Sequence, residues 1–491
     1  MGGIVKGVVV DHALLQFQNG NGDNNKNPIF LLLRKLRFSN IRAAISYELS
    51  LPAELVNLLQ STAELHSLEC LPVSASSLDI APRQISLAWP GVSGTILYLL
   101  PNCNASPSIT CISFPVAPDV DITNSHHQSN MIYMDKLEEL PLTICRINKQ
   151  AISNNVVTVG YVMKPSREED FAKRGAFPLC PTPNGLIFFP LTFELPISTQ
   201  LEEADAILHK ATDEIVSIEL NSSSEPSYRI TYTTGMQELQ RYIESQSHCI
   251  EVDPLNSIYP VLDRLKILQI LLGLEDLSKE GCCKIRAPHF LKVNDFNEPD
   301  LVQRLQDAKL SLPSIVKPQV ACGVAESHSM AIVFRVEDFK GLSVPVPAII
   351  QEYVDHSSTL FKFYVLGEEV FHAVKKSIPN ADILMKSSER TDLRPLLFDS
   401  LKSLPTATGN QHSGCENLSL DLGLVKEAAE WLRRMLGLNI FGFDVVIQEG
   451  SSDHVIVDVN YLPSFKEVPD EIAIPTFWDA IKKKVKSNHK Q

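Results

Sequence analysis

The sequence predicts an α/β protein that is built from several domains. Three observations support this prediction: the chain has 491 residues, 44% of them are hydrophobic and 21% are charged, and apolar β-branched runs alternate with segments of helical periodicity. A chain of this length commonly forms about two to four domains. The composition supplies a sizeable core and excludes global disorder. We therefore expect helices that are layered on sheets.

The charge balance excludes several classes of partner. The chain has 44 Lys and Arg against 58 Asp and Glu, a net charge of −14, which argues against broad binding to nucleic acid or to an acidic membrane. The sequence contains no run of 18 or more apolar residues and no signal-peptide pattern. The ten cysteines are scattered and have no zinc-site spacing, as is typical of reduced thiols. We expect a soluble monomer in the cytoplasm, and also in the nucleus.

The first 150 residues have the pattern of a separate α/β domain. Apolar runs rich in β-branched residues predict three buried strands, at residues 7–10, 29–33 and 95–100. Residues 51–68 carry apolar side chains at helical spacing. Residues 115–153 are more polar and show few strand signals, so we expect a connecting or covering segment there.

From residue 156 onward, strands and helices alternate up to the C-terminus. Strand character is found at residues 156–163, 206–208, 314–317, 331–334, 348–354, 359–366 and 370–374. Helical periodicity predicts helices at residues 261–272 and 424–436 and a last helix at 477–485. The helix at 424–436 has one apolar stripe, and Gly437 fits a left-handed stop. Residues 403–414 are rich in Ser, Thr and Gly and predict a loop.

Residues 439–461 carry a pair of aspartates on a predicted hairpin. Two apolar runs flank a Glu-Gly-Ser-Ser-Asp turn, and a turn symmetric about Ser451 places Asp444 opposite Asp458 with Cβ atoms about 5 Å apart. Asn460 lies on the same face as Asp458. Facing carboxylates repel unless a cation compensates them, and two carboxylates with an amide oxygen suit Mg²⁺. The alternative is that one Asp faces solvent and the other caps a turn.

Two lysines interrupt apolar strands in the same part of the chain. Lys317 lies in Ser-Ile-Val-Lys-Pro and Lys362 in Leu-Phe-Lys-Phe-Tyr. Such a lysine normally marks an edge strand, but beside a magnesium hairpin it suits the phosphates of a nucleotide triphosphate. The small residues of the segment 321–330 allow the backbone to approach phosphates. Because no Walker A motif and no protein-kinase motif set occurs, both of those classes are excluded.

The order of these pieces resembles the ATP-grasp kinases and, more specifically, the inositol-tetrakisphosphate 1-kinase family, also called inositol 1,3,4-trisphosphate 5/6-kinases. The matching segments are residues 159–161, 208–213, 253–254, 262–264, 327–334, 441–444 and 457–460. The resemblance extends over residues 156–475. It implies an ATP-grasp fold with three subdomains, at residues 151–255, 256–350 and 351–491, after an extra N-terminal domain at 1–150.

The resemblance also implies an activity, which is transfer of the γ-phosphate of ATP to a ring hydroxyl of an inositol tris- or tetrakisphosphate. The residues implied for ATP are Arg264, Lys317, Gln351, Glu352, Tyr353, Val354, Ser377 and Ser400. The residues implied for one or two Mg²⁺ ions are Asp444, Asp458 and Asn460. The residues implied for the inositol phosphate are Arg167, Lys210, His328, Lys362, Lys375 and Asn460. Among these, Lys362 and His328 would draw the acceptor toward the γ-phosphate.

Three departures from the family pattern fall at positions implied for the substrate. The usual lysine cluster after Gly-Tyr is replaced by residues 164–169, in which only Arg167 falls at the substrate-binding position. The usual His before the loop glycine is Cys322, and the usual Gly after Asp-x-Asn is Ser464. These changes leave the kinase prediction intact, and they leave open which inositol phosphate is used.

The N-terminal extension resembles the haloacid-dehalogenase-like phosphatases at one motif. An apolar strand ends at Asp11, but position 13, where that family has its second Asp, is Ala13. We therefore expect a non-catalytic α/β domain, as in long plant members of the kinase family.

Two other functions share parts of this pattern. An ATP-grasp ligase that joins a carboxylate to an amine would use the same aspartates and lysines, but His328, Lys362 and the His209-Lys210 pair suit a polyanionic acceptor better. A non-catalytic inositol phosphate binder would explain Cys322, but it would not need two aspartates arranged for a metal.

Overall fold

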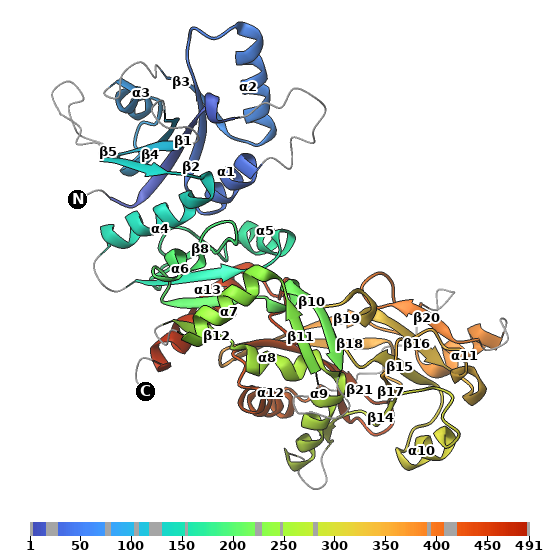
Figure 1. Cartoon of the computed structure of the whole chain (residues 1–491). Coiled ribbons are helices and arrows are strands. Elements are labelled where there is room, and N and C mark those ends of the chain that lie inside the picture. Colours follow the sequence, from blue (N-terminus) through green and yellow to red (C-terminus); the bar gives the residue numbers. More distant parts are fainter. Residues whose placement is uncertain are drawn as a thin grey trace. The chain divides into compact units, whose positions relative to one another are not determined.

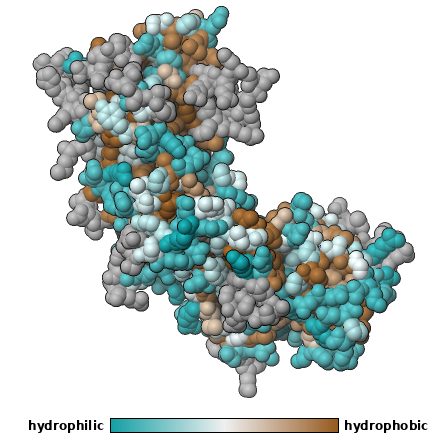
Figure 2. Space-filling view, viewed as in Figure 1, coloured by the Kyte–Doolittle hydropathy of each residue, from teal (hydrophilic) through white to brown (hydrophobic). Residues whose placement is uncertain are grey.

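The computed structural model describes residues 3–15, 28–73, 80–102, 108–116, 130–152, 156–220, 228–245, 249–277, 283–389, 394–406 and 420–488. The chain divides into two compact units. Figure 1 labels the helices and strands. Unit 1 comprises Met1–Leu208 and Glu238–Ile250, and unit 2 comprises His209–Gln237 and Glu251–Gln491. None of the described helices has the length and apolar character needed to cross a bilayer. Hydrophilic and neutral residues make up most of the described surface that is visible in Figure 2.

Unit 1 begins with a sheet that has, among the described residues, six strands in the order β3-β2-β1-β4-β5-β6. The strands are β1 (Val5–Asp11), β2 (Arg42–Tyr47), β3 (Glu69–Pro72), β4 (Gly94–Pro101), β5 (Ile109–Val116) and β6 (Asn130–Met134). Strands β1 to β4 pair in parallel, whereas β5 and β6 are antiparallel. The helices between the parallel strands are α1 (Pro28–Phe38), α2 (Ala53–Leu65) and α3 (Ile80–Ala88).

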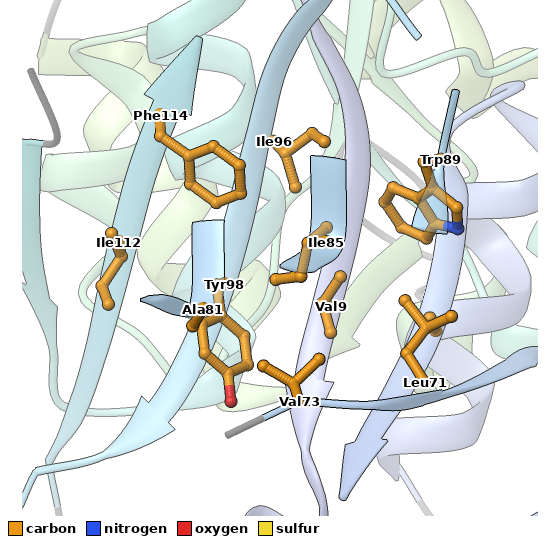
Figure 3. Packing of buried hydrophobic residues seen from close by; sticks show 11 residues of the cluster. Val9, Leu71, Val73, Ala81, Ile85, Trp89, Ile96, Tyr98, Ile112 and Phe114 are labelled. Carbon is orange, nitrogen blue, oxygen red and sulfur yellow. The ribbon is translucent and has the colours of Figure 1, made fainter. Parts of the chain in front are cut away.

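An apolar cluster packs α3 against this sheet (Figure 3). Val9 and Phe114 on the strands and Ile85 and Trp89 from the α3 side are all fully buried. Gly7 allows this close approach, because a Cβ atom at that position would lie 2.3 Å from the Trp89 ring. The cluster gives the six-stranded sheet of unit 1 a hydrophobic core.

The rest of unit 1 contains α4 (Leu140–Ala151), α5 (Pro165–Lys173), α6 (Ile197–Leu201) and α7 (Thr234–Ser245). A four-stranded sheet has the order β12-β9-β7-β8. Its strands are β7 (Val157–Val162), β8 (Leu186–Pro190), β9 (Ala206–His209) and β12 (Ile250–Val252). The division between the units falls within β9, α7 and β12, so the first residues of α7 belong to unit 2.

In the described part of the chain, unit 2 contains two five-stranded sheets. The C-terminal sheet has the order β13-β22-β21-β18-β19, with β13 (Ile285–Arg286), β18 (Thr359–Leu366), β19 (Glu369–Lys376), β21 (Ile440–Ile447) and β22 (His454–Tyr461). The central sheet has the order β14-β17-β15-β16-β20, with β14 (Phe290–Val293), β15 (Ser314–Pro318), β16 (Ser329–Val333), β17 (Ala348–Glu352) and β20 (Leu396–Asp399). A separate hairpin is formed by β10 (Ile215–Leu220) and β11 (Tyr228–Tyr232).

The helices of unit 2 are α8 (Leu255–Leu262), α9 (Arg264–Leu271), α10 (Leu301–Asp307), α11 (Ala381–Glu389), α12 (Leu422–Leu436) and α13 (Asp470–Asn488). The predicted stripe of α12 is confirmed, since its apolar residues are buried and Gly437 has φ 67°. The predicted helix at 261–272 is interrupted at Asp263, which caps α9 through the amides of Leu265 and Lys266. The predicted strands from residue 156 onward are confirmed, with small differences at their ends.

Two predictions for the N-terminal domain are wrong. Residues 29–33 belong to α1 and not to a strand. Phe30, Leu33 and Leu36 are its buried residues, a helical spacing that a five-residue run is too short to reveal. Residues 115–153 hold β6 and α4 besides connecting segments. Residues 117–129 and most of the predicted loop at 403–414 lie outside the described residues.

Candidate functional site

Asp444 and Asp458 face each other across strands β21 and β22. The structure confirms that they are register partners. On the turn side of this pair the register differs by one residue, because Val445 pairs with Ile456. If that register continued through Asp444, its partner would be Val457 and not Asp458. A β-bulge at Val457 restores the pairing of the two aspartates. The bulge therefore determines that both carboxylates occupy the same face of the sheet.

Lys362 extends this pair into a row across three strands. It is the register partner of Asp444 on β18, and its Nζ lies 3.5 Å from Asp444 Oδ2. Residues directly opposite each other on neighbouring strands share a face. Asn460, two residues beyond Asp458, donates from Nδ2 to Asp458 Oδ2 at 2.9 Å. One cation, two carboxylates and an amide thus meet on one face of the C-terminal sheet.

An additional cation would stabilise the two carboxylates of this row in their charged form. Burial raises the pKa of Asp444, with Lys362 opposing the increase and Asp458 adding to it. The carboxylate of Asp444 therefore stays charged most easily when a positive group joins the site. In the described part of the chain, no three His, Cys, Asp or Glu residues gather as a metal site. A metal held here would complete its shell with water or substrate oxygens, which is the habit of Mg²⁺.

Lys317 connects the central sheet to this site. It lies on β15, and its Nζ is 3.4 Å from the carbonyl oxygen of Val457, the bulge residue. Burial lowers its pKa to about 8, opposed by the charge of Asp458. At neutral pH the side chain is still a cation, and it is directed at the hairpin that carries the aspartates.

Arg264 is a buried cation that holds the backbone of the loop between β15 and β16. Its guanidinium donates to the carbonyl oxygens of Pro318 at 2.7 Å, Val320 at 2.9 Å, Ser327 at 3.2 Å and Ala321 at 3.3 Å. The resemblance implies a contact between Arg264 and ATP. The structure shows the guanidinium hydrogen-bonded to the loop that would cover the phosphates, so the geometry favours an action through that loop.

His328 lies at the end of the same loop, in the 3₁₀ turn Ala325–His328. Its Nδ1 is 3.2 Å from Ser400 Oγ, so the structure brings together two residues that the sequence assigned separately. Burial lowers the pKa of His328, and the positive charge of Arg264 adds to this shift. The imidazole is therefore neutral near pH 7 and can donate a hydrogen bond from one nitrogen.

The predicted hinge at the end of β17 has its side chains engaged within the protein. Gln351 is buried. Glu352 forms an ion pair with Arg286, and Val354 packs against Val446 and Val455. The hydroxyl of Tyr353 donates to the Pro379 carbonyl, and the amide of Ser377 donates to the Ser358 carbonyl at 2.8 Å. A ligand would meet this segment mainly through backbone groups.

Two further lysines lie near the ends of C-terminal strands. Lys375 on β19 forms an ion pair with Glu467, and it shares the face of Lys362, because its partner on β18 is Leu360. Lys210 donates to the Tyr461 carbonyl and lies 4.8 Å from the centre of the Tyr461 ring. Arg167 lies on α5 of unit 1.

Sequence reasoning missed two features of this region. Asp253 is buried and accepts from the amides of Asn439 at 2.5 Å and Ile440 at 2.9 Å, at the start of β21. The Asp-Pro motif at residues 253–254 is one of the segments that match the family, but the match does not indicate that Asp253 binds backbone amides. Arg286 was missed entirely, since it lies in a two-residue strand without any distinctive pattern around it.

Comparisons with known proteins agree with the motif resemblance. The family model "ITPK4, N-terminal HAD-like domain" matches residues 1–150, and "Inositol 1,3,4-trisphosphate 5/6-kinase ATP-grasp domain" matches residues 280–479. Inositol-tetrakisphosphate 1-kinase 6 of Oryza sativa subsp. japonica is 48% identical over 93% of this chain and 84% of that protein. Inositol-tetrakisphosphate 1-kinase of Danio rerio is 27% identical over 64% of this chain and 75% of that protein. Among solved structures, D-alanine–D-alanine ligase of Bacillus anthracis aligns over 69% of this chain and 99% of that chain, with a TM-score of 0.39 and 12% identity.

Proposed function

Because the chain belongs to the inositol-tetrakisphosphate 1-kinase family, we propose that it transfers the γ-phosphate of ATP to a ring hydroxyl of an inositol tris- or tetrakisphosphate. The observation that carries this proposal is the row of Lys362, Asp444 and Asp458 across three neighbouring strands. The row places two carboxylates that can coordinate a metal ion beside a lysine that can bind a phosphate.

The metal fits the residues that are present. Asp444, Asp458 and Asn460 would hold one or two Mg²⁺ ions, because their oxygen donors match this hard cation and leave positions open for water and phosphate. Bound there, Mg²⁺ would supply neutralisation of the charge on the β- and γ-phosphates.

The nucleotide would lie between the two sheets of unit 2. Lys317 reaches from the central sheet to the carbonyl of Val457, so its ammonium is available to the phosphates that meet the hairpin. Arg264 fixes the loop 321–328 through the carbonyls of Ala321 and Ser327, and that loop would cover the phosphates with its backbone amides. The backbone after β17 would hold the adenine, and Ser377 and Ser400 would contact the nucleotide.

The acceptor would be held by cations and by neutral donors. Lys362 is next to Asp444 and would attract an acceptor phosphate close to the metal site. His328 would donate a hydrogen bond as a neutral imidazole, and Asn460 would bind on the same face as Asp458. The additional residues proposed for the inositol phosphate are Arg167, Lys210 and Lys375. Alignment and charge stabilisation then let a ring hydroxyl attack the γ-phosphorus in line, with ADP as the leaving group and the hydroxyl proton released to solvent.

A product assay tests this proposal. The purified chain is incubated with Mg²⁺ and ATP and a panel of inositol tris- and tetrakisphosphates, and the products are separated by anion-exchange chromatography. We expect ADP and an inositol phosphate with one more phosphate group. The variant Asp458→Ala provides the matched control, because contaminating kinases would be unaffected by it. Binding of an inositol phosphate without any transfer would instead favour a non-catalytic binder.

A further inference from the structure

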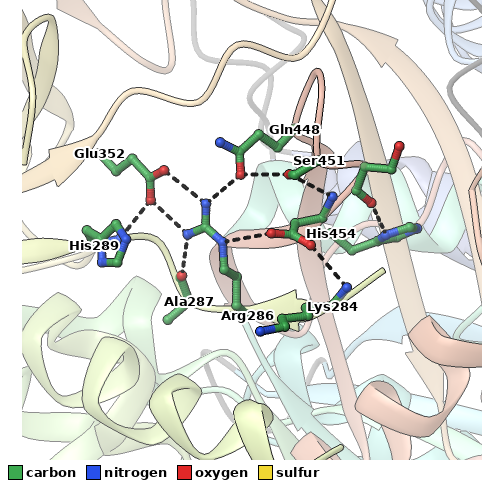
Figure 4. A network of polar contacts seen from close by, with 10 residues as sticks. Lys284, Arg286, Ala287, His289, Glu352, Gln448, Ser451 and His454 are labelled. Carbon is green, nitrogen blue, oxygen red and sulfur yellow. Dashed lines mark hydrogen bonds and ion pairs between the residues drawn. The ribbon is translucent and has the colours of Figure 1, made fainter. Parts of the chain in front are cut away.

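Arg286 forms an ion pair that crosses from one sheet of unit 2 to the other (Figure 4). It belongs to β13 at the edge of the C-terminal sheet, where it pairs with Val455 of β22. Glu352 is the last residue of β17 in the central sheet. The guanidinium donates to both carboxylate oxygens of Glu352, at 2.8 and 2.9 Å. This two-point contact fixes distance and orientation together.

The same guanidinium also contacts the turn of the aspartate hairpin. It donates to Gln448 Oε1 at 2.8 Å, and its Nε lies 3.8 Å from Asp453 Oδ2. Gln448 and Asp453 close the turn between β21 and β22, since the amide of Gln448 donates to the Asp453 carbonyl at 2.8 Å. One side chain therefore joins the end of the predicted nucleotide hinge to the hairpin that carries Asp444 and Asp458.

The surroundings of the pair make this contact more than a surface ion pair. The Arg286 and Glu352 side chains are only 16% and 14% exposed. Burial opposes ionisation of Glu352, but hydrogen bonds from Arg286 and from the His289 amide outweigh it and hold the pKa of Glu352 below its ordinary value. At this exposure the cost of desolvation offsets much of the attraction between the two charges, whereas the two-point contact still fixes the relative position of the side chains.

We infer that Arg286 is a positioning residue, which sets the placement of the hinge after β17 relative to the Asp444 and Asp458 carboxylates. This inference rests on the proposed function, because ATP must reach the hinge with its adenine and the carboxylates with its phosphates. Arg286 acts through Glu352 and Gln448. A displacement of about 1 Å between the two ends of the nucleotide site is enough to cost a large part of the rate.

The variant Arg286→Met, which removes the guanidinium and its two-point contact with Glu352, tests the inference. We expect the KM for ATP to rise about tenfold or more and the KM for the inositol phosphate to change less than about twofold. Arg286→Lys keeps the charge but loses the two-point contact, so it should fall between Arg286→Met and the unmodified chain. Equal changes in both KM values would overturn the inference.

The chain offers a matched control in Arg335. Its guanidinium also grips a carboxylate at two points, with 2.8 Å to each oxygen of Asp338. That pair is local, because the two residues are three positions apart. We expect Arg335→Met to change both KM values by less than about twofold. A comparable rise in the KM for ATP in Arg335→Met would show that loss of any two-point arginine–carboxylate pair weakens ATP binding, and the inference would fail.

A double variant separates positioning from simple charge compensation. Arg286→Met alone leaves the Glu352 carboxylate unpaired, which lowers the Tm. Arg286→Met combined with Glu352→Met removes both charges and should restore the Tm, while the KM for ATP stays raised. Recovery of both values would overturn the inference. If the unmodified chain transfers no phosphate, the proposed function fails, and the Kd for ATP measured by calorimetry on the same variants still tests the role of Arg286.

Discussion

Each unit of the molecule carries an aspartate on a sheet, buried at Asp11 and partly buried at Asp444, but the two surroundings differ. In unit 1, Asp11 ends β1, and its Oδ2 accepts from Ser46 Oγ at 3.3 Å and from the Tyr98 hydroxyl at 3.2 Å. Its Oδ1 accepts from the Ala13 amide at 2.9 Å. In unit 2, Asp444 faces a second carboxylate and a lysine. The first aspartate accepts hydrogen bonds from two hydroxyls and an amide, with His12 Nδ1 3.3 Å from its Oδ1, whereas the second lies opposite another carboxylate and needs additional positive charge.

This difference teaches how the surroundings of a carboxylate indicate its role. A buried carboxylate that accepts several neutral hydrogen bonds is satisfied within the fold. Ala13 occupies the position of a second acid beside Asp11, so the paired carboxylates that suit a divalent ion are found at Asp444 and Asp458. We therefore expect the chemistry of this chain in unit 2 and a structural role for Asp11, and four predictions probe this comparison.

The largest effect is expected at Asp458. Its replacement by alanine removes one of the two carboxylates that would hold the metal, and we expect turnover to fall about a thousandfold or more, with the fold intact. Initial rates with Mg²⁺ and ATP measure the loss, and circular dichroism checks the fold. Near-normal turnover would remove Asp458 from the site and would end the contrast between the two units.

The next effect is expected at Lys362. Its replacement by alanine takes away the cation that lies 3.5 Å from Asp444, so kcat should fall about a hundredfold and the KM for the inositol phosphate should rise. Steady-state kinetics with each substrate varied in turn measure both constants. Unchanged constants would mean that the lysine serves only to balance the charge of Asp444.

Much of this geometry could be predicted from the sequence where the signal is local. The stripe of α12 repeats over enough turns to determine its buried face. The pairing of Asp444 with Asp458 was also predicted, but from a symmetric turn, and the structure reaches it through a bulge at Val457. A bulge depends on packing and on the partner strand, and no pattern in the sequence reports it.

Contacts between distant segments could not be predicted in the same way. Arg286 and Glu352 are 66 positions apart, and only the tertiary fold brings these sheets together. Arg264 was expected at ATP because of its place in a motif, while its guanidinium lies on the loop carbonyls. Motif order therefore indicated candidate residues, most of them in unit 2. It did not predict which of them contact a ligand and which of them hold the backbone.

A moderate effect is expected from pH through Lys317. Burial lowers its pKa to about 8, so the side chain loses its charge as the pH rises through 8, and the KM for ATP should increase several-fold between about pH 7 and 9. In the absence of ATP, a rise in pH has the opposite consequence: the contribution of Lys317 to the free energy of unfolding increases. The folded chain releases the proton before the unfolded chain, so stability rises from pH 8 toward the ordinary lysine pKa.

Kinetics across this pH range measure the effect, with Lys317→Arg as the control. An arginine keeps its charge throughout, so the KM for ATP of that variant should stay level between pH 7 and 9. If both proteins follow the same profile, the titrating group is not Lys317.

The smallest effect on kinase activity is expected at Asp11. Replacement by asparagine removes the charged acceptor of Ser46 and Tyr98, which should lower the stability of unit 1 by about 1–2 kcal/mol. Both kinase KM values should stay within about twofold of the unmodified chain, because Asp11 takes no part in the proposed transfer. Thermal unfolding measures the first effect, and hydrolysis of p-nitrophenyl phosphate tests for hidden phosphatase activity. A phosphatase rate in the unmodified chain that disappears in Asp11→Asn would mean that Asp11 is catalytically active in spite of its hydrogen bonds to hydroxyl groups. The two units would then differ in the substrate they use, and not in whether they catalyse a reaction.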